Sequence, residues 1–496
     1  MDIYKRLVFV GVVLCTVCRA KKNVLFLVAD DMRPQIGAYY GEDFPAPVYP
    51  KMHTPNLDKL ASKSLLLKRA YVQVALCSPS RTSLLTGRRP DTTHVYTIGP
   101  YFRHVGGNFT TLPEYFKQNG YTTAGMGKIF HPGRASGGDD PISWTEPYFH
   151  GVANFESHER SWTAVPDELL VETPLIDEQI ANQAIKTLQR VAPDAKSGKK
   201  PFFVAAGFHK PHLPFVFPES MFKYYPGVYL PDNPYAPVNM PKVAWYDYAG
   251  LRGYSDITVL NATGGINTTL PGQVVLDLRR AYYSALSWTD SLIGRVVNEL
   301  HRLGLADNTI ISFWGDHGYQ LGEHGEWCKQ TNFELATHAP MMLHIPGLTN
   351  NGIPTRQLTE FVDLFPTLVD AAGLKSLTEC PENSTGIELC TEGTSLMPLI
   401  SQPKTPVKKA AFSQYTRGKY MGYTVRTDKY RYTEWPKFHY HPAYKPDWTI
   451  LAGVELYDHT TDPQENVNNA DNPSYKDIRQ MLSNMLRAGW RKATNL

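Results

Sequence analysis

The chain has 496 residues, which exceeds one ordinary hydrophobic core and predicts a large α/β domain together with a smaller one. Hydrophobic residues make up 42% of the sequence and aromatic residues 12%, a composition that excludes a disordered protein. The net charge is only +3 and no run of like charges occurs, so the sequence lacks the basic footprint of a nucleic-acid-binding protein.

Residues 1–20 have the pattern of a secretory signal peptide. Lys5 and Arg6 precede an apolar run over residues 7–17, and Cys18 and Ala20 are small residues before the expected cleavage point. The run is short for a bilayer span and no later stretch is apolar enough, so we expect no stable membrane insertion. A short signal anchor is the alternative interpretation.

The cysteines and sequons fit passage through the secretory pathway. Cys380 and Cys390 flank a short loop and are expected to form a disulfide in an oxidising compartment. Cys77 and Cys328 are the other two cysteines beyond the signal peptide, and a disulfide between them is the structural alternative to a role in chemistry. Four N-x-S/T sequons are possible glycosylation sites: Asn108, Asn261, Asn267 and Asn383.

In chain order, the first predicted element is a buried parallel strand over residues 23–28. It ends in Asp30 and Asp31, and two adjacent carboxylates at the carboxyl end of a central strand fit a cation or ligand site in an open α/β sheet. The alternative is a solvated pair of loop acids. We favour the site, because like charges side by side next to a buried strand require a cation.

Residues 77–87, CSPSRTSLLTG, are predicted to form a helix. Pro79 suits its first turn, Ser78 or Ser80 suits its cap, and Gly87 suits its C-terminal end.

Cys77 is therefore expected at a helix N-terminus, where free N–H groups and the helix dipole favour an anion. Arg81 lies one turn further on and can point at the same place. A buried, inert cysteine before a helix is the alternative.

Strands and helices alternate through the first 400 residues, which predicts a mostly parallel sheet whose carboxyl edge carries the site. Residues 134–175 and 213–272 show little periodicity and are predicted to be irregular; the length of the second suggests loops that shape a pocket. The remaining predicted strands cover residues 65–72, 121–126, 201–208, 309–314 and 341–345. One predicted helix begins at Thr54-Pro55, and the others cover residues 111–119, 177–191, 274–303 and 363–372.

Charged or titratable side chains follow three more of these strands. Lys128 and His131 follow the strand at 121–126, His209 follows the strand at 201–208, and Asp316 and His317 follow the strand at 309–314. Asp30, Asp31 and Asp316 offer the oxygen-rich, anionic cage that a hard divalent cation prefers. A second set supplies positive charge for an anionic ester and for charge that develops in a transition state: Arg81, Lys128, His131, His209 and Lys329.

After about residue 405 the pattern changes to short alternating runs, which predict an antiparallel sheet, followed by an amphipathic helix near residues 475–492. We therefore expect a catalytic domain over residues 21–405 and a smaller C-terminal subdomain over residues 406–496.

Residues 77–87 match the sulfatase signature C-x-P-S-R followed by L-T-G at every position, and the chain resembles the sulfatase family over nearly all of its mature length. The resemblance implies an alkaline-phosphatase-like sulfatase fold, with a large mostly parallel sheet flanked by helices and a smaller C-terminal antiparallel-sheet α+β subdomain. It also implies that a formylglycine-generating enzyme oxidises Cys77 to Cα-formylglycine, whose hydrate attacks the sulfur of a sulfate ester.

The same resemblance implies the roles of the charged residues. One Ca²⁺ per chain is expected to be bound by residue 77 together with Asp30, Asp31, Asp316 and His317. The sulfate is expected to be surrounded by Arg81, Lys128, His131, His209 and Lys329.

Several segments resemble one branch of the family, the sulfatases that remove the 2-O-sulfate of terminal iduronate from dermatan sulfate and heparan sulfate. They are residues 30–34, 87–93, 127–133, 209–212 and 316–327. The resemblance implies a lysosomal enzyme that travels through the secretory pathway, with secretion as the alternative. Three rival functions remain: another secreted sulfatase, a related phosphate or phosphonate monoester hydrolase, and a carbohydrate-binding relative without turnover.

Overall fold

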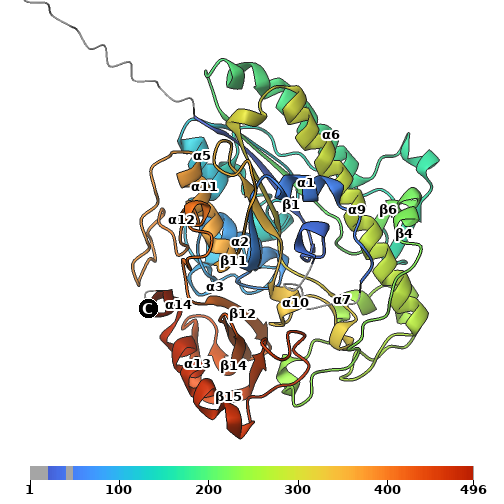
Figure 1. Cartoon of the computed structure of the whole chain (residues 1–496), viewed down its shortest axis with the longest axis vertical. Coiled ribbons are helices and arrows are strands. Elements are labelled where there is room, and N and C mark those ends of the chain that lie inside the picture. Colours follow the sequence, from blue (N-terminus) through green and yellow to red (C-terminus); the bar gives the residue numbers. More distant parts are fainter. Residues whose placement is uncertain (1–20, 41–48, 495–496) are drawn as a thin grey trace, which may run out of the picture.

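The structure, a computed structural model, describes residues 21–40 and 49–494. The predicted signal peptide, and the signal anchor weighed against it, lie outside the described residues. Figure 1 shows a large α/β body and, in orange to red, a smaller C-terminal sheet with its helix beside it. Within the described part of the chain, no helix combines the length and the apolar character needed to cross a membrane.

A seven-stranded sheet forms the centre of the larger body, in the order β11-β2-β10-β7-β1-β5-β3. Neighbouring strands run parallel except at β10, which is antiparallel to both β2 and β7. The predicted mostly parallel sheet is thus confirmed. Its strands are β1 (Asn23–Ala29), β2 (Leu65–Tyr71), β3 (Thr122–Gly127), β5 (Phe202–Phe208), β7 (Thr309–Gly315), β10 (Met341–His344) and β11 (Ile353–Glu360).

Helices cover both faces of this sheet, so its central strands β1, β5 and β7 are buried along their whole length. Such burial on both faces explains why the sequences of these strands are continuous apolar runs. Alternate residues of β1 belong to two separate cores: Leu25 and Leu27 pack with α6 (Ile176–Lys196) and α9 (Gly272–Arg302). Phe26 packs on the other face, where α2 (Cys77–Thr86), α5 (Leu112–Gln118) and α11 (Leu364–Ala371) lie.

The C-terminal sheet is antiparallel, in the order β12-β13-β14-β15, as predicted. The amphipathic helix α13 (Lys476–Ala488) packs Leu482 and Leu486 against it, in a core of its own. The four strands are β12 (Ala411–Arg417), β13 (Tyr420–Arg426), β14 (Tyr430–His439) and β15 (Lys445–Asp458). Where the boundary between the two domains falls stays a prediction.

Two of the segments predicted to be irregular contain a short strand each, so that prediction was wrong there. β4 (Trp162–Val165) and β6 (Phe215–Pro218) pair in parallel. Each strand has only four residues and its partner lies about 50 positions away, so neither segment carries a periodic signal. The remaining short elements are β8 (Gln320–Leu321), β9 (Trp327–Cys328), α1 (Pro55–Ala61), α3 (Pro90–Thr93), α4 (Phe102–Val105), α7 (Ala249–Arg252), α8 (Ser255–Thr258), α10 (Glu334–Thr337), α12 (Pro398–Ser401) and α14 (Trp490–Thr494).

The structure contains a disulfide between Cys380 and Cys390. Cys77 and Cys328 are both free and buried, so a disulfide between them, the structural alternative for Cys77, is absent from this structure. The asparagines of all four sequons are exposed, at positions 108, 261, 267 and 383. Whether they carry glycans stays a prediction.

Candidate active site

Four adjacent strands of the central sheet end at one edge, and each delivers a charged or polar side chain there. Ala29 of β1 lies opposite both Phe208 of β5 and Gly315 of β7, while Gly127 of β3 lies opposite Gly207. The residues that follow directly are Asp30, His209, Asp316 and Lys128. The sheet register therefore brings together residues that are almost 300 positions apart.

Helix α2 presents Cys77 to this edge from its first position. The helix is buried along its whole length and ends at Gly87, whose φ of 63° is the left-handed conformation that glycine adopts at helix ends. The expected serine cap was wrong, because Leu76 precedes the helix and no side chain caps it. Cys77 already takes the first helical position, so both serines lie inside the helix, and Ser80 Oγ instead donates to the carbonyl of Asp316.

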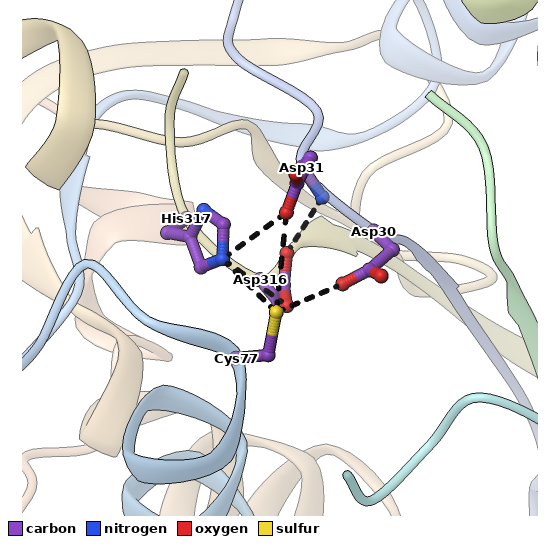
Figure 2. A group of neighbouring side chains, drawn as sticks. All are labelled: Asp30, Asp31, Cys77, Asp316 and His317. Carbon is purple, nitrogen blue, oxygen red and sulfur yellow. Dashed lines mark hydrogen bonds and ion pairs between the residues drawn. The ribbon is translucent and has the colours of Figure 1, made fainter. Parts of the chain in front are cut away.

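Five potential metal ligands, the Cys77 sulfur among them, form one cluster at this edge (Figure 2). They are Asp30, Asp31, Cys77, Asp316 and His317, and their ligand atoms all lie within 4.8 Å of one another. Cys77 Sγ is 3.5 Å from Asp30 Oδ1 and 3.9 Å from Asp31 Oδ1. Asp31 has a φ of 59°, a conformation that aspartate tolerates, and its backbone N–H donates to Asp316 Oδ1 at 2.9 Å. The three carboxylates are thus held by the backbone turn as well as by the strand ends.

The hydrogen bond of His317 orients its ring toward the cluster. Its Nδ1 lies 2.8 Å from the carbonyl oxygen of Gly318, which can only accept, so Nδ1 carries the proton. In the neutral ring Nε2 then presents a lone pair, at 3.4 Å from Cys77 Sγ and 3.3 Å from Asp31 Oδ1. This is the arrangement of a metal-ligating histidine.

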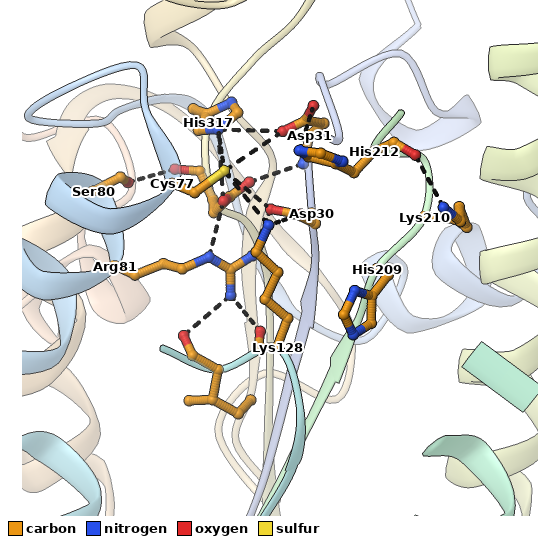
Figure 3. A network of polar contacts seen from close by, with 12 residues as sticks. Asp30, Asp31, Cys77, Ser80, Arg81, Lys128, His209, Lys210, His212 and His317 are labelled. Carbon is orange, nitrogen blue, oxygen red and sulfur yellow. Dashed lines mark hydrogen bonds and ion pairs between the residues drawn. The ribbon is translucent and has the colours of Figure 1, made fainter. Parts of the chain in front are cut away.

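Two lysines, Lys128 and Lys329, neutralise part of the carboxylate charge, and Figure 3 shows the first of them beside Asp30 and Cys77. Lys128 Nζ pairs with Asp30 and lies 3.7 Å from Cys77 Sγ. Lys329 Nζ donates to both oxygens of Asp31, at 2.6 and 2.7 Å. Burial alone would raise the pKa of both aspartates, but the neighbouring cations outweigh it and lower the pKa, strongly for Asp30.

The guanidinium of Arg81 bonds mainly to the carboxylates and the backbone, and its expected contact with the sulfate stays a prediction. The side chain is fully buried and donates to Asp316 Oδ2 at 2.9 Å, to Asp30 Oδ1 at 2.8 Å and to the carbonyls of Lys128 and Ile129. These four acceptors saturate most of its donors. We therefore assign Arg81 the role of orienting the carboxylates.

The Cys77 thiol is only 3% exposed, and burial together with the charge of Asp30 raises its pKa. A thiol in this position stays protonated and is a poor nucleophile.

The two predicted histidines, His131 and His209, are half-buried near the same charges. Burial and then the charge of Lys128 lower the pKa of His131 to about 4 and that of His209 well below its usual value. Both rings are therefore neutral in the free site. No hydrogen bond joins either ring to the carboxylate cluster within the described residues.

His212 was missed by the sequence reasoning as a site residue. Its Nδ1 donates to the carbonyl of Leu213 at 2.5 Å, and its Nε2 lies 3.9 Å from Asp31 Oδ2. It is 34% exposed and so lies where the cluster opens to solvent. The signal was present, because His212 stands three positions after His209 in the same loop that follows β5.

The donor set fits a hard divalent cation. Asp30, Asp31 and Asp316 supply carboxylate oxygens, the ligands that Ca²⁺ and Mg²⁺ prefer, and His317 adds a nitrogen. Burial and the charge of Asp30 raise the pKa of Asp316, although Arg81 opposes them. Three carboxylates this close repel one another when all are ionised, and a bound cation would relieve that repulsion.

Comparison with known families gives two matches that together span nearly the whole chain. The Sulfatase family model matches residues 22–374, and a model described as N-sulphoglucosamine sulphohydrolase, C-terminal, matches residues 322–492. Iduronate 2-sulfatase of Homo sapiens is 35% identical to the chain, covering 96% of it and 98% of the human protein. Iduronate 2-sulfatase of Mus musculus is 36% identical, covering 90% of each chain.

Solved structures share the architecture at lower identity. The phosphonate monoester hydrolase of Agrobacterium radiobacter superposes with a TM-score of 0.68 and 20% identity, covering 96% of each chain. BT4656, solved in complex with its substrate D-glucosamine-2-N,6-O-disulfate, also gives a TM-score of 0.68 at 20% identity, covering 96% of this chain and 98% of that one. At such identities these matches show a shared fold.

Proposed function

Because the chain belongs to the sulfatase family and is a sulfuric ester hydrolase, we propose that it hydrolyses the 2-O-sulfate of terminal iduronate in dermatan sulfate and heparan sulfate. The observation that carries the proposal is the position of Cys77, at a helix N-terminus between three carboxylates and two lysines. Its substrate class is supported by the two iduronate 2-sulfatases, which match the chain over at least 90% of their length.

The proposed nucleophile is a hydrate of formylglycine at position 77. The two hydroxyl oxygens of that hydrate would stand where the structure has Cys77 Sγ. Since this side chain is buried, a formylglycine-generating enzyme must reach it before the chain has folded. The protonated state of the thiol supports the need for this modification, because unmodified Cys77 would attack sulfur poorly.

The proposed reaction is a displacement at sulfur followed by an elimination that regenerates the aldehyde. One hydroxyl of the hydrate loses its proton to a base of the site and its oxygen attacks sulfur, the bond from sulfur to the sugar oxygen breaks, and a histidine gives that oxygen a proton. The second hydroxyl then loses its proton, the bond from carbon to the sulfate oxygen breaks, and sulfate leaves. Water adds to the aldehyde to restore the hydrate.

Lys128 and Lys329 are the cations best placed to bind the sulfate, because each combines a carboxylate contact with a position beside residue 77. Their charges would offset negative charge that develops on the sulfate oxygens.

A calcium ion held by Asp30, Asp31, Asp316, His317 and residue 77 would polarise the ester and lower the pKa of the attacking hydroxyl. The residues that we assign to it supply mostly oxygen ligands, as calcium prefers.

His131 and His209 are the proposed proton donors to the sugar oxygen. Their pKa values are lowered in the free site, and the negative charge of a bound sulfate ester would raise them. An acidic compartment would further favour the charged form, which fits the proposed passage through the secretory pathway to the lysosome. Secretion stays the alternative destination.

The decisive experiment measures sulfate release from a defined disaccharide with terminal 2-sulfated iduronate, and determines the mass of the peptide that contains residue 77 in the same sample. We expect turnover together with formylglycine at position 77, and loss of turnover in Cys77→Ala. Active protein with an unmodified residue 77 would refute the proposed nucleophile.

Parallel assays separate the rival functions. Turnover of an aryl sulfate without the iduronate substrate would identify another sulfatase, and preferred turnover of an aryl phosphate or phosphonate would identify a phosphoester or phosphonate hydrolase. A carbohydrate-binding relative would bind sulfated oligosaccharide equally well as wild type and as Cys77→Ala, with no turnover of any ester.

A further inference from the structure

Arg417, at the end of β12 in the C-terminal sheet, reaches across to the catalytic body beside the active site. Its Nη2 donates to the carbonyl of Gln330 at 2.7 Å, and Gln330 directly follows Lys329, a proposed sulfate-binding residue. The guanidinium carbon lies 5.1 Å from the centre of the Tyr415 ring and 5.5 Å from that of Tyr246. Two aromatic rings and one carbonyl therefore fix the position of this cation.

Tyr415 ties the same strand to the segment that carries the nucleophile. It shares the face of β12 with Arg417, two residues away, and packs against Leu76, the residue before Cys77. Its hydroxyl donates to Gln330 Oε1 at 3.2 Å, and the backbone N–H of Gln330 donates to Ala75 at 3.1 Å. Through Tyr415 and Gln330, Arg417 is thus linked to the residues that directly precede residue 77.

The charge of Arg417 is not balanced by a carboxylate. Within residues 21–40 and 49–494, no acidic side chain forms an ion pair with Arg417, and its buried Nε has no hydrogen-bond partner. Glu326 is an acidic group close enough to interact electrostatically with the Arg417 guanidinium. Burial raises the pKa of Glu326 to about 8 despite Arg417, so that carboxyl stays protonated at neutral and acidic pH. Other arginines of this domain, Arg426 and Arg431, by contrast, pair with buried glutamates.

We propose that Arg417 binds the carboxylate of the uronate ring whose 2-sulfate is hydrolysed. The inference rests on the proposed function and extends it to the residue that selects a uronate over a neutral sugar. Lys329 directly precedes Gln330, whose carbonyl Arg417 bonds, so a uronate with its 2-sulfate at Lys329 would lie close to Arg417. Among the described residues the guanidinium donates through Nη2, to Gln330, which leaves Nη1 for the substrate carboxylate.

The test compares kcat/KM for two matched substrates, a 2-sulfated iduronate glycoside and its carboxyl methyl ester, and for an aryl sulfate that lacks the sugar. In Arg417→Ala we expect kcat/KM for the acid substrate to fall about 10- to 100-fold, mainly through KM, because one charge-assisted contact is lost. The kcat/KM values for the methyl ester and for the aryl sulfate should change less than about threefold. Arg417→Lys should retain part of the preference for the acid, since it keeps the charge but not the planar fork.

Lys419→Ala is the matched control, because Lys419 is an exposed cation in the adjoining turn. We expect this variant to leave kcat/KM unchanged for all three substrates. An equal loss on the acid and on its methyl ester in Arg417→Ala, or no loss on either, would overturn the inference while leaving the iduronate activity intact.

A wild type that hydrolyses the aryl sulfate but not the iduronate glycoside would instead overturn the proposed function. In that case the inference is decided by inhibition of aryl sulfate turnover. If Arg417 binds a carboxylate, free iduronate should inhibit the wild type more strongly than its methyl ester does, and Arg417→Ala should abolish the difference. Equal inhibition of the wild type by both compounds would refute it.

Discussion

At the scale of single residues, Arg81 is the side chain on which the candidate site depends most. It joins the carboxylates of two different strands, Asp30 after β1 and Asp316 after β7, and bonds to the backbone after β3. All of these groups are fully buried, so each charge depends on its partner for stability.

Replacing Arg81 by Met should destabilise the protein by about 3–5 kcal/mol, because two buried carboxylates lose their partner. Turnover should be lost as well. The midpoint of thermal unfolding and the rate of sulfate release measure the two effects.

Arg190→Met is the control, because Arg190 pairs with Glu146 at the surface, where an ion pair contributes about 1 kcal/mol or less. If Arg81→Met melted at the same temperature as this control, the orienting role of Arg81 would be wrong.

At the scale of elements, the parallel pairing of β3 with β5 places Lys128 beside Asp30. The two strands approach so closely at their ends that a Cβ atom on Gly207 would lie 2.2 Å from the carbonyl oxygen of Lys128. Gly127 meets the same constraint from the other strand, with a Cβ 2.0 Å from the Gly207 oxygen, and has a φ of 70°. The absence of side chains at these two positions is what allows Lys128 to reach the site.

Gly207→Ala should therefore push the end of β3 outward and move Lys128 away from Asp30. We expect a loss of stability of about 1–3 kcal/mol, typical of an overpacked core, and a larger fractional loss of turnover than of folded protein. Thermal unfolding of the purified variant measures the loss of stability, and steady-state kinetics measures the loss of turnover.

Gly227→Ala is the matched control, because an added Cβ there has open space around it and we expect wild-type behaviour. Wild-type kinetics in Gly207→Ala would show that the close approach of the strands does not set the position of Lys128.

At the scale of the whole molecule, buried ion pairs join the C-terminal sheet to the catalytic body. Glu360, at the end of β11, accepts from both terminal nitrogens of Arg89 at 2.7 and 2.6 Å and from Lys408 at 2.8 Å. It also accepts the backbone N–H of Phe412 in β12 at 2.8 Å. A second buried ion pair joins β13 to α10, where Arg426 donates to Glu334 at 2.9 Å. The position of Arg417 at the active site depends on this attachment.

These pairs predict how stability changes with pH. Burial would raise the pKa of Glu360, but Arg89 and Lys408 outweigh it and lower the pKa to about 2, below the ordinary value of 4.5. A lowered pKa in the folded state means that the contribution to stability is complete above about pH 4.5 and is lost as the pH falls toward 2.

Glu360→Gln should therefore destabilise the protein most above pH 4.5, by an amount on the order of 3 kcal/mol, with the difference shrinking at lower pH. Thermal unfolding midpoints of both proteins between pH 3 and pH 7 test this, with the exposed Glu382→Gln as control. A difference that stayed constant over this range would contradict the prediction.

Much of the fold and of the candidate site was accessible to sequence reasoning because the signals are local. The buried runs that became β1, β5 and β7 and the apolar stripes of α6 and α9 each lie within a single stretch of chain. The rule that parallel strands end at a common edge then placed Asp30, Lys128, His209 and Asp316 together.

Other features escaped the sequence because they depend on contacts between distant segments. β11 has polar, partly exposed residues at its beginning and lies at the edge of the sheet, so its pattern is weak. The pairing of β4 with β6 is equally short. The contacts of Arg81 with the protein could not be foreseen, because a cation near an anion site can face either the substrate or the protein, and only the positions of its four acceptors show where its donors point.

The sequence by itself determined the family, the position proposed for the nucleophile and the edge of the sheet that carries the candidate site, because a contiguous motif and buried strands encode these locally. Only the tertiary structure decided which cations are saturated by the protein and which remain available to a substrate. Arg81 belongs to the first kind and Arg417 to the second, and both look alike in sequence. The physical reason is that the availability of a charge depends on partners that the fold brings from hundreds of residues away.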